Sequence, residues 1–233
     1  MSQVNAIYKN FTTSSHGIGK FGFINIKGTG YNKEKRVGKE PRMVYSADLI
    51  IGKDSPILKE IKIQAEALWD EFKTTYGYKG ALTYGYNSKC VGITPHRIPD
   101  PEGTIDPETE AVQYIDTGDW VIKAYTNVSS AKGDTIVKVF DHKGTDISTA
   151  YQNVEWNIGS DSTGGLMVSL CANDAGGTPK VTIYLQGVQV AKLVKYEGNT
   201  MEIVNIEGED IDLDGGMPAI VDTEAGDTEP DIA

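Results

Sequence analysis

The chain has 233 residues, of which 39% are hydrophobic and 26 are glycine. That length suits one large domain or two small ones, and no apolar run is long enough to predict a membrane-spanning helix. The first residues lack the apolar stretch of a secretory signal. Two cysteines and three histidines are too few for a disulfide scaffold and show no zinc-binding spacing. A reduced, cytosolic protein is therefore expected.

The charge is divided unevenly along the chain. The formal net charge is −11, but residues 1–97 carry 15 lysines and arginines against 8 acidic residues. Residues 98–201 carry 7 against 14, and residues 202–233 carry none against 11. An acidic tail thus masks a body whose first half is basic, so the low overall pI does not exclude nucleic acid as a ligand.

Hydrophobic periodicity predicts a β-rich domain with one strong helix. Strands are expected at residues 21–27 and 43–51. Ser55 and Pro56 then begin an amphipathic helix of about twenty residues that Gly77 ends. Further strands are expected at residues 120–128, 135–140, 165–172, 181–185 and 188–194, with a bulge at Gly187. Residues 95–118 are rich in proline and acids and are interpreted as a surface connection.

Many short strands and one helix inserted after the second strand predict a small closed or nearly closed barrel. From about Gly208 the composition becomes acidic and poor in large side chains, which is typical of disorder. The expected organisation is therefore a folded domain over residues 1–207 and a disordered tail over residues 208–233.

No pattern of a catalytic site or a cofactor site is present. The chain lacks a Gly-x-Ser-x-Gly elbow, a cysteine with a nearby histidine in sequence, and a Walker motif. The acidic residues from Asp100 to Glu110 do not have the spacing of a calcium loop, so a solvated loop is favoured there. We expect neither an enzyme nor a bound cofactor or metal.

A basic cluster precedes the second strand and consists of Lys33, Lys35, Arg36, Lys39 and Arg42. Such a cluster is often only a solvated surface, but aromatic residues strengthen the alternative. Single-stranded nucleic acids are bound by cationic grooves that also expose aromatic faces, because every nucleotide has a phosphate and a base. Lys123 and Tyr125 lie two residues apart on one strand and share a face, although Tyr125 packing in the core fits the pattern equally well.

The other aromatic residues are assigned by their surroundings. Tyr78, Tyr84 and Tyr86 lie in a glycine-rich segment and could stack on bases or close the loop over the barrel. Trp69, Trp120 and Trp156 are expected in the core. In the tail, Asp227, Glu229 and Asp231 surround Ile232, which is the pattern of a docking peptide, whereas simple solubilisation is the alternative.

The order of several motifs resembles the single-stranded DNA-binding replication proteins of tailed bacteriophages, of the T-seven type and its prophage relatives. The motifs are Pro41-Arg42-x-Val44-Tyr45, Asp48-Leu49-x-Ile51 before the helix, Lys123-x-Tyr125, Val139-Phe-Asp-x-Lys143-Gly144, and Leu185-x-x-Val188-x-Val190-x-x-Leu193. Two features depart from the family: residues 166–170 lack its lysine and tyrosine, and the tail ends without an aromatic residue.

The resemblance implies an OB-fold core with an inserted helix. It also implies that Arg42, Lys123 and Tyr125 contact single-stranded DNA during phage replication, recombination and repair in the host cytoplasm. The acidic tail would compete with DNA for the groove and contact the phage DNA polymerase and primase-helicase, and a homodimer would be compatible with this role. The alternative from a different class is a β-rich virion structural or adaptor protein with a solubilising tail.

Overall fold

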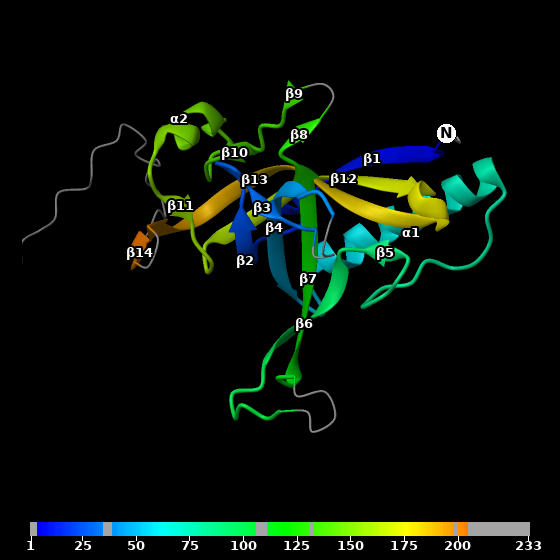
Figure 1. Cartoon of the computed structure of the whole chain (residues 1–233), viewed down its shortest axis with the longest axis horizontal. Helices are drawn as coiled ribbons and strands as arrows, with labels where there is room; N and C mark the ends of the chain where they lie inside the picture. The colour runs from blue at the N-terminus through cyan, green and yellow to red at the C-terminus, as the bar shows by residue number, and fades with distance from the viewer. Residues whose placement is uncertain (1–3, 35–38, 106–110, 131–132, 198–199, 205–233) are drawn as a thin grey trace, which may run out of the picture.

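The computed structural model describes residues 4–34, 39–105, 111–130, 133–197 and 200–204. The long elements are β1 (Ala6–Thr12), β2 (Gly19–Asn25), β4 (Met43–Gly52), α1 (Pro56–Tyr76), β6 (Ile93–Pro99), β7 (Tyr114–Asn127), β12 (Thr163–Asn173) and β13 (Lys180–Glu197). The short elements are β3 (Tyr31–Asn32), β5 (Cys90–Val91), β8 (Ser129–Ser130), β9 (Gly133–Asp134), β10 (Lys138–Phe140), α2 (Ser148–Asn153), β11 (Asn157–Ile158) and β14 (Thr200–Val204). Figure 1 shows how these elements are arranged.

Five strands close into a ring. Their order is β2, β4, β7, β13 and β12, and β12 pairs again with β2. All neighbours are antiparallel except β7 and β13, which run parallel where Tyr125 lies opposite Tyr184. If the five are numbered along the chain, the ring order is 1-2-3-5-4. This is the five-stranded Greek-key barrel of the OB-fold, and the predicted fold class is confirmed.

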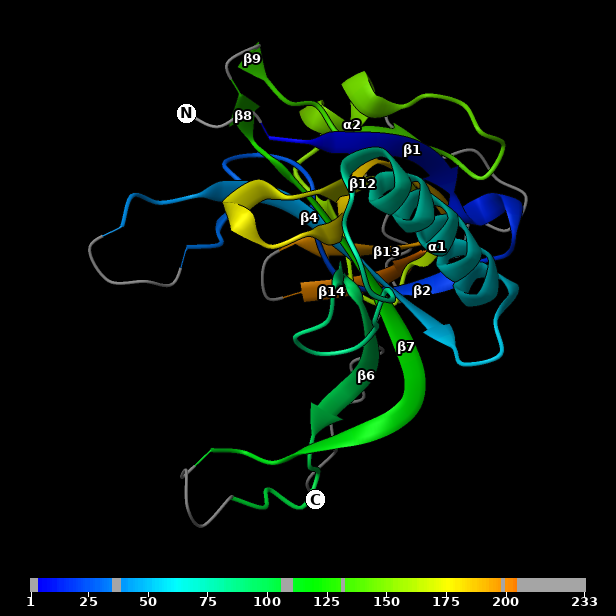
Figure 2. The same ribbon diagram turned by 90° about the vertical axis from the view of Figure 1, so that its right-hand side faces the viewer.

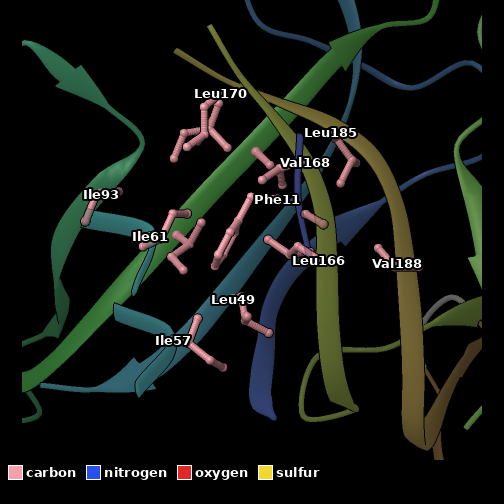
Figure 3. Packing of buried hydrophobic residues seen from close by; sticks show 14 of the residues in the cluster. Phe11, Leu49, Ile57, Ile61, Ile93, Leu166, Val168, Leu170, Leu185 and Val188 are labelled. Carbon is pink, nitrogen blue, oxygen red and sulfur yellow. The ribbon is translucent and has the colours of Figure 1, made fainter. Parts of the chain in front are cut away.

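The barrel interior is filled by alternate side chains of these strands. Leu49, Leu166, Val168, Leu185 and Val188 are at most 2% exposed, and Figure 3 shows several of them facing one another across the barrel. Because side chains alternate between the two faces of a strand, the intervening residues of β4, β7 and β13 face outward. This alternation places the functional candidates on the outer surface.

Helix α1 has the bounds that its sequence predicts. The Ser55 hydroxyl accepts a hydrogen bond from the Ile57 N–H, and Gly77 adopts the left-handed conformation that ends the helix. Ile57 and Ile61 are fully buried and extend the core against β1 and β12, beside which α1 lies in Figure 2. The helix therefore covers one part of the barrel and leaves the outer face of β4 and β7 open.

The last predicted strands form one long strand, β13. The pairing of β12 with β13 shifts by one residue between Met167 and Val168, opposite Gly187 and Leu185. A bulge therefore lies beside Gly187, as predicted. A Cβ at Gly187 would approach the Lys138 carbonyl oxygen to 2.8 Å, so glycine also lets β10 pair closely with β13.

Residues 95–118 were expected to be a surface connection, and this expectation is wrong in part. Strands β6 and β7 pair there as a hairpin, with Ile98 opposite Ile115 and Arg97 opposite Asp116. The hairpin projects away from the barrel (Figures 1 and 2). The proline and acidic residues of this segment suggested a loop. That expectation failed because β6 pairs with the part of β7 that extends beyond the barrel.

The remaining predictions concern the three tryptophans, two residues of the basic cluster and the tail. Trp69 and Trp156 are buried, while Trp120 is half-buried against the core. Lys35, Arg36 and the tail from residue 208, including Asp227, Glu229, Asp231 and Ile232, lie outside the described residues. Within the described part of the chain, no helix has both the length and the hydropathy to cross a membrane.

Gly92 fixes the junction between the hairpin and the barrel. Its φ is +113°, and a Cβ there would lie 2.5 Å from the Lys123 carbonyl oxygen. We expect Gly92→Ala to lower the free energy of unfolding by about 1–3 kcal/mol more than Gly103→Ala does. Gly103 is a matched control because its φ is also positive and a Cβ there meets no described atom within 4 Å. Equal losses in urea unfolding would show that the contact at Gly92 is unimportant.

Candidate nucleic-acid interface

A continuous groove crosses the outer face of the barrel. Two hollows of about 400 and 420 Å³ share Lys33, Lys123 and Tyr125, and a third of about 190 Å³ shares Lys123 with both. We call these three hollows together the groove. The charged and aromatic side chains that line it are Phe23, Tyr31, Lys33, Asp48, Tyr86, Arg97, Lys123 and Tyr125.

Tyr125 lies at the centre of the cationic part of the groove. The Lys33 Nζ lies 2.9 Å from the centre of its ring, and the Arg42 Cζ lies 5.5 Å from that centre. Both distances fit cation–π contacts. Tyr125 is half-buried but lines the outer groove rather than the barrel core. Of the two interpretations left open by the sequence, the outward one matches its position.

The loop between β3 and β4 is fastened at both ends. The Asn32 Oδ1 accepts hydrogen bonds from the backbone N–H of Glu34 and of Arg42, at 3.0 and 2.9 Å. The Lys33 N–H donates to the Arg42 carbonyl oxygen, 2.8 Å away. Arg42 Nε donates to Asn127 Oδ1 on β7, at 3.1 Å. Lys33 and Arg42 are thus fastened to the sheet by hydrogen bonds, although Arg42, like Lys39 of the same loop, is exposed.

Burial changes the ionisation of the groove side chains. Desolvation, reinforced by the neighbouring charge of Arg42, lowers the pKa of Lys33 to about 8. Desolvation raises the pKa of Asp48 to about 6, although Lys123 and Lys33 oppose this change. Asp48 lies opposite Lys123 in the β4–β7 pairing, and the Asp48 Oδ2 is 3.8 Å from the Lys123 Nζ. The groove therefore combines cations with one partly buried carboxylate.

Exposed aromatic rings line the groove, and Phe23 and Tyr86 both border its smallest hollow. Phe23 is 49% exposed and packs edge-on against Tyr31 at 5.2 Å. Tyr86 is 50% exposed, and its hydroxyl donates to the Pro95 carbonyl oxygen while Arg97 lies over its ring at 4.7 Å. Exposed rings and adjacent cations are the two components of sites that bind single-stranded nucleic acid.

Tyr78 and Tyr84 do not reach the groove. The Tyr78 ring stacks on that of Phe72 of α1 at 5.2 Å, and its hydroxyl donates a hydrogen bond to Asp174 Oδ2. The Tyr84 hydroxyl lies within hydrogen-bond distance of the Lys62 carbonyl oxygen and of Glu66 on the same helix. Both tyrosines therefore close their segment over the helix and the core, which was the alternative reading of the glycine-rich stretch, and Tyr86 alone of the three lines the groove.

Five groove-side residues were missed by sequence analysis, among them Tyr31 at the start of the basic loop. Phe23 faces outward because the β2–β4 pairing is irregular between Phe21 and Ile24, and alternation alone would place it with the buried Phe21. Arg97 lies in the hairpin that was interpreted as a connection. Asp48 was noted only within a motif, and Tyr184, whose ring meets Tyr125 at 5.9 Å, could have been found by alternation with the buried Ile183.

Asp48 should cost the protein stability at neutral pH. Its pKa is raised in the folded state, so protonation of Asp48 stabilises the fold fully at pH values below the unfolded pKa. This stabilisation is lost as the pH rises through the folded-state pKa of about 6. We expect Asp48→Asn to be more stable than wild type by about 1–3 kcal/mol at about pH 7.5, with a smaller difference at about pH 5.

Urea unfolding of both proteins at the two pH values measures this difference. Asp70→Asn is the control, because Asp70 is an exposed carboxylate on α1 that pairs with Lys73. A stability difference for Asp48→Asn that does not change with pH would contradict the expected titration.

Several solved structures are similar to this chain. No family model and no curated protein matches the chain. The crystal structure of gp2.5, a single-stranded DNA binding protein encoded by bacteriophage T7, is 18% identical, with 83% of this chain and 91% of that chain covered at a TM-score of 0.43. The single-stranded DNA-binding protein of bacteriophage Enc34 is similar as a C-terminal truncation (16% identity, 79% and 84% covered, TM-score 0.45) and in complex with ssDNA (19% identity, 83% and 88% covered, TM-score 0.41).

Proposed function

We propose that this protein is a non-enzymatic, phage-encoded protein that coats single-stranded DNA without strict sequence specificity. The observation that carries the proposal is the contact of Lys33 and Arg42 with the face of Tyr125 inside a groove that Lys123 also lines. A face of this kind on strands two and three of an OB-fold is where such folds bind oligonucleotides. The motif order that resembles phage replication proteins supports the same function.

The groove residues, together with Arg42 beside Tyr125, have two roles in binding. The cations at Lys33, Arg42, Arg97 and Lys123 neutralise phosphates, and the rings at Phe23, Tyr86 and Tyr125 stack on bases. Because every base has a π-face and every nucleotide a phosphate, this arrangement tolerates most sequences. The roles in phage replication, recombination and repair, and the location in the host cytoplasm, belong to the same proposal and rest on the sequence resemblance.

We also propose that the tail of residues 208–233 regulates access to the groove. It carries nine carboxylates and no lysine or arginine, so it is an electrostatic mimic of the phosphate backbone. A tethered competitor acts at high effective concentration. Its end, with Asp227, Glu229, Asp231 and Ile232, would be free to contact the phage polymerase and primase-helicase once DNA displaces it.

The first prediction from the proposed function separates phosphate contacts from base contacts. Lys123→Ala and Arg42→Ala should weaken binding to single-stranded DNA and flatten the slope of log affinity on log salt by about 0.7 per lost phosphate contact. Tyr125→Ala should cost about 1–3 kcal/mol of binding free energy and change the slope little. Fluorescence anisotropy at several salt concentrations measures both quantities.

The controls for this prediction lie on α1. Lys59→Ala removes an exposed lysine and Tyr76→Ala an exposed ring, and neither residue lines the groove. Both variants should bind like wild type. Absence of salt-dependent binding by the wild-type protein would favour the virion structural role, and tighter binding to the matching RNA would assign the groove to RNA.

The second prediction concerns the tail. Deletion of residues 208–233 should tighten binding to single-stranded DNA, and the gain should shrink as salt rises, because screening shortens the reach of the tail's charge. The full-length chain with the nine carboxylates replaced by amides serves as a length-matched control and should behave like the deletion. Unchanged affinity of both variants at low salt would show that the tail only solubilises the protein.

A further inference from the structure

Asp48 is a carboxylate without a hydrogen-bond donor. Its side chain is 20% exposed, and it accepts no hydrogen bond from the described residues, since the Lys123 Nζ at 3.8 Å is beyond hydrogen-bond distance. The carboxylate is only partly buried and lines two of the hollows of the groove. A ligand that enters the groove can therefore donate a hydrogen bond to it.

The neighbours of Asp48 restrict what that donor can be. Asp48 lies in the hollow that Phe23, Lys33, Lys123 and Tyr125 also line. A phosphate placed against Asp48 would be repelled by its charge, and a metal cation would be repelled by the two lysines. A neutral donor held between the rings of Phe23 and Tyr125 meets neither objection. The exocyclic amino and ring N–H groups of a nucleobase are donors of this kind.

We propose that Asp48 is a specificity-determining residue that accepts hydrogen bonds from the Watson–Crick edge of a base and makes the groove favour guanine at this subsite. This inference rests on the proposed binding of single-stranded DNA. It deepens that function, because it adds a preference for base composition to a surface that otherwise tolerates every sequence.

The order of bases follows from the positions of their donors. Guanine presents a ring N–H beside an amino group, so one carboxylate can accept from both at once. Cytosine and adenine offer an amino group next to an unprotonated ring nitrogen, which gives a single bond. Thymine offers one N–H between two carbonyl oxygens that repel a carboxylate. Guanine should therefore bind tightest at Asp48 and thymine weakest.

The test compares three oligonucleotides of about 16 nucleotides: alternating guanine and thymine, alternating inosine and thymine, and thymine alone. Inosine has the ring N–H of guanine but lacks its amino group, so the two alternating strands differ only in the second donor. Full-length wild-type protein should bind the guanine strand about fivefold or more tightly than the inosine strand. Anisotropy titrations at a fixed salt concentration give this ratio.

Variants at Asp48 decide whether the carboxylate is the cause. In Asp48→Ala the ratio of guanine to inosine affinity should fall to about one, while binding to thymine alone should tighten because a negative charge has been removed. Asp70→Asn is the matched control and should keep the wild-type ratio. If Asp48 only positioned Lys123, the affinities of Asp48→Ala for all three strands would change by one common factor, and that result would overturn the inference.

The two proposals fail in different ways. If wild-type protein binds none of the three strands, the proposed function is wrong. If it binds all three with salt dependence but with equal affinity for the guanine and inosine strands, only the role of Asp48 is wrong. If Asp48→Ala keeps the guanine preference, that preference comes from stacking, and Asp48 is not its source.

Discussion

The parallel contact between β7 and β13 is the constraint on which the binding face depends. At this junction Tyr125 lies opposite Tyr184, and their rings meet edge to face at 5.9 Å. The contact closes the ring of strands and at the same time fixes the Tyr125 ring on the outer surface. Lys33 and Arg42 then lie against that ring, so the closure of the barrel and the construction of the groove share one residue.

Local signals in the sequence predicted the elements whose ends are fixed by local chemistry. Helix α1 was predictable because Ser55, Pro56 and Gly77 cap it, and the shared face of Lys123 and Tyr125 follows from strand alternation. The position of Phe23 was not predictable, because the irregular pairing beside it depends on β4 rather than on β2. The same holds for Tyr78 and Tyr84, whose partners Phe72 and Lys62 are supplied by the packing of the helix.

Asp48 lowers the stability of the folded protein at neutral pH and places a hydrogen-bond acceptor in the groove. Burial raises the pKa of its carboxyl to about 6, so at neutral pH the folded protein holds a charge in an environment that disfavours it. The nearest cations are Lys33 and Lys123, and each of them gives up part of its attraction for phosphate by facing a carboxylate. Strongly perturbed ionisable groups in clefts are typical of functional sites, and this cost is hard to explain by packing alone.

In the proposed function, Lys33 links stacking on bases to the binding of phosphates. Its Nζ covers the Tyr125 ring at 2.9 Å, so a base that stacks on Tyr125 has to displace it. The displaced ammonium group leaves an environment whose desolvation lowers its pKa to about 8 and becomes available to the phosphate of the same nucleotide. Under this proposal one exchange uncovers the ring and frees the cation, so that the two contributions to binding would be coupled rather than independent. The fastening of the loop at Asn32 keeps the freed cation within reach of the strand.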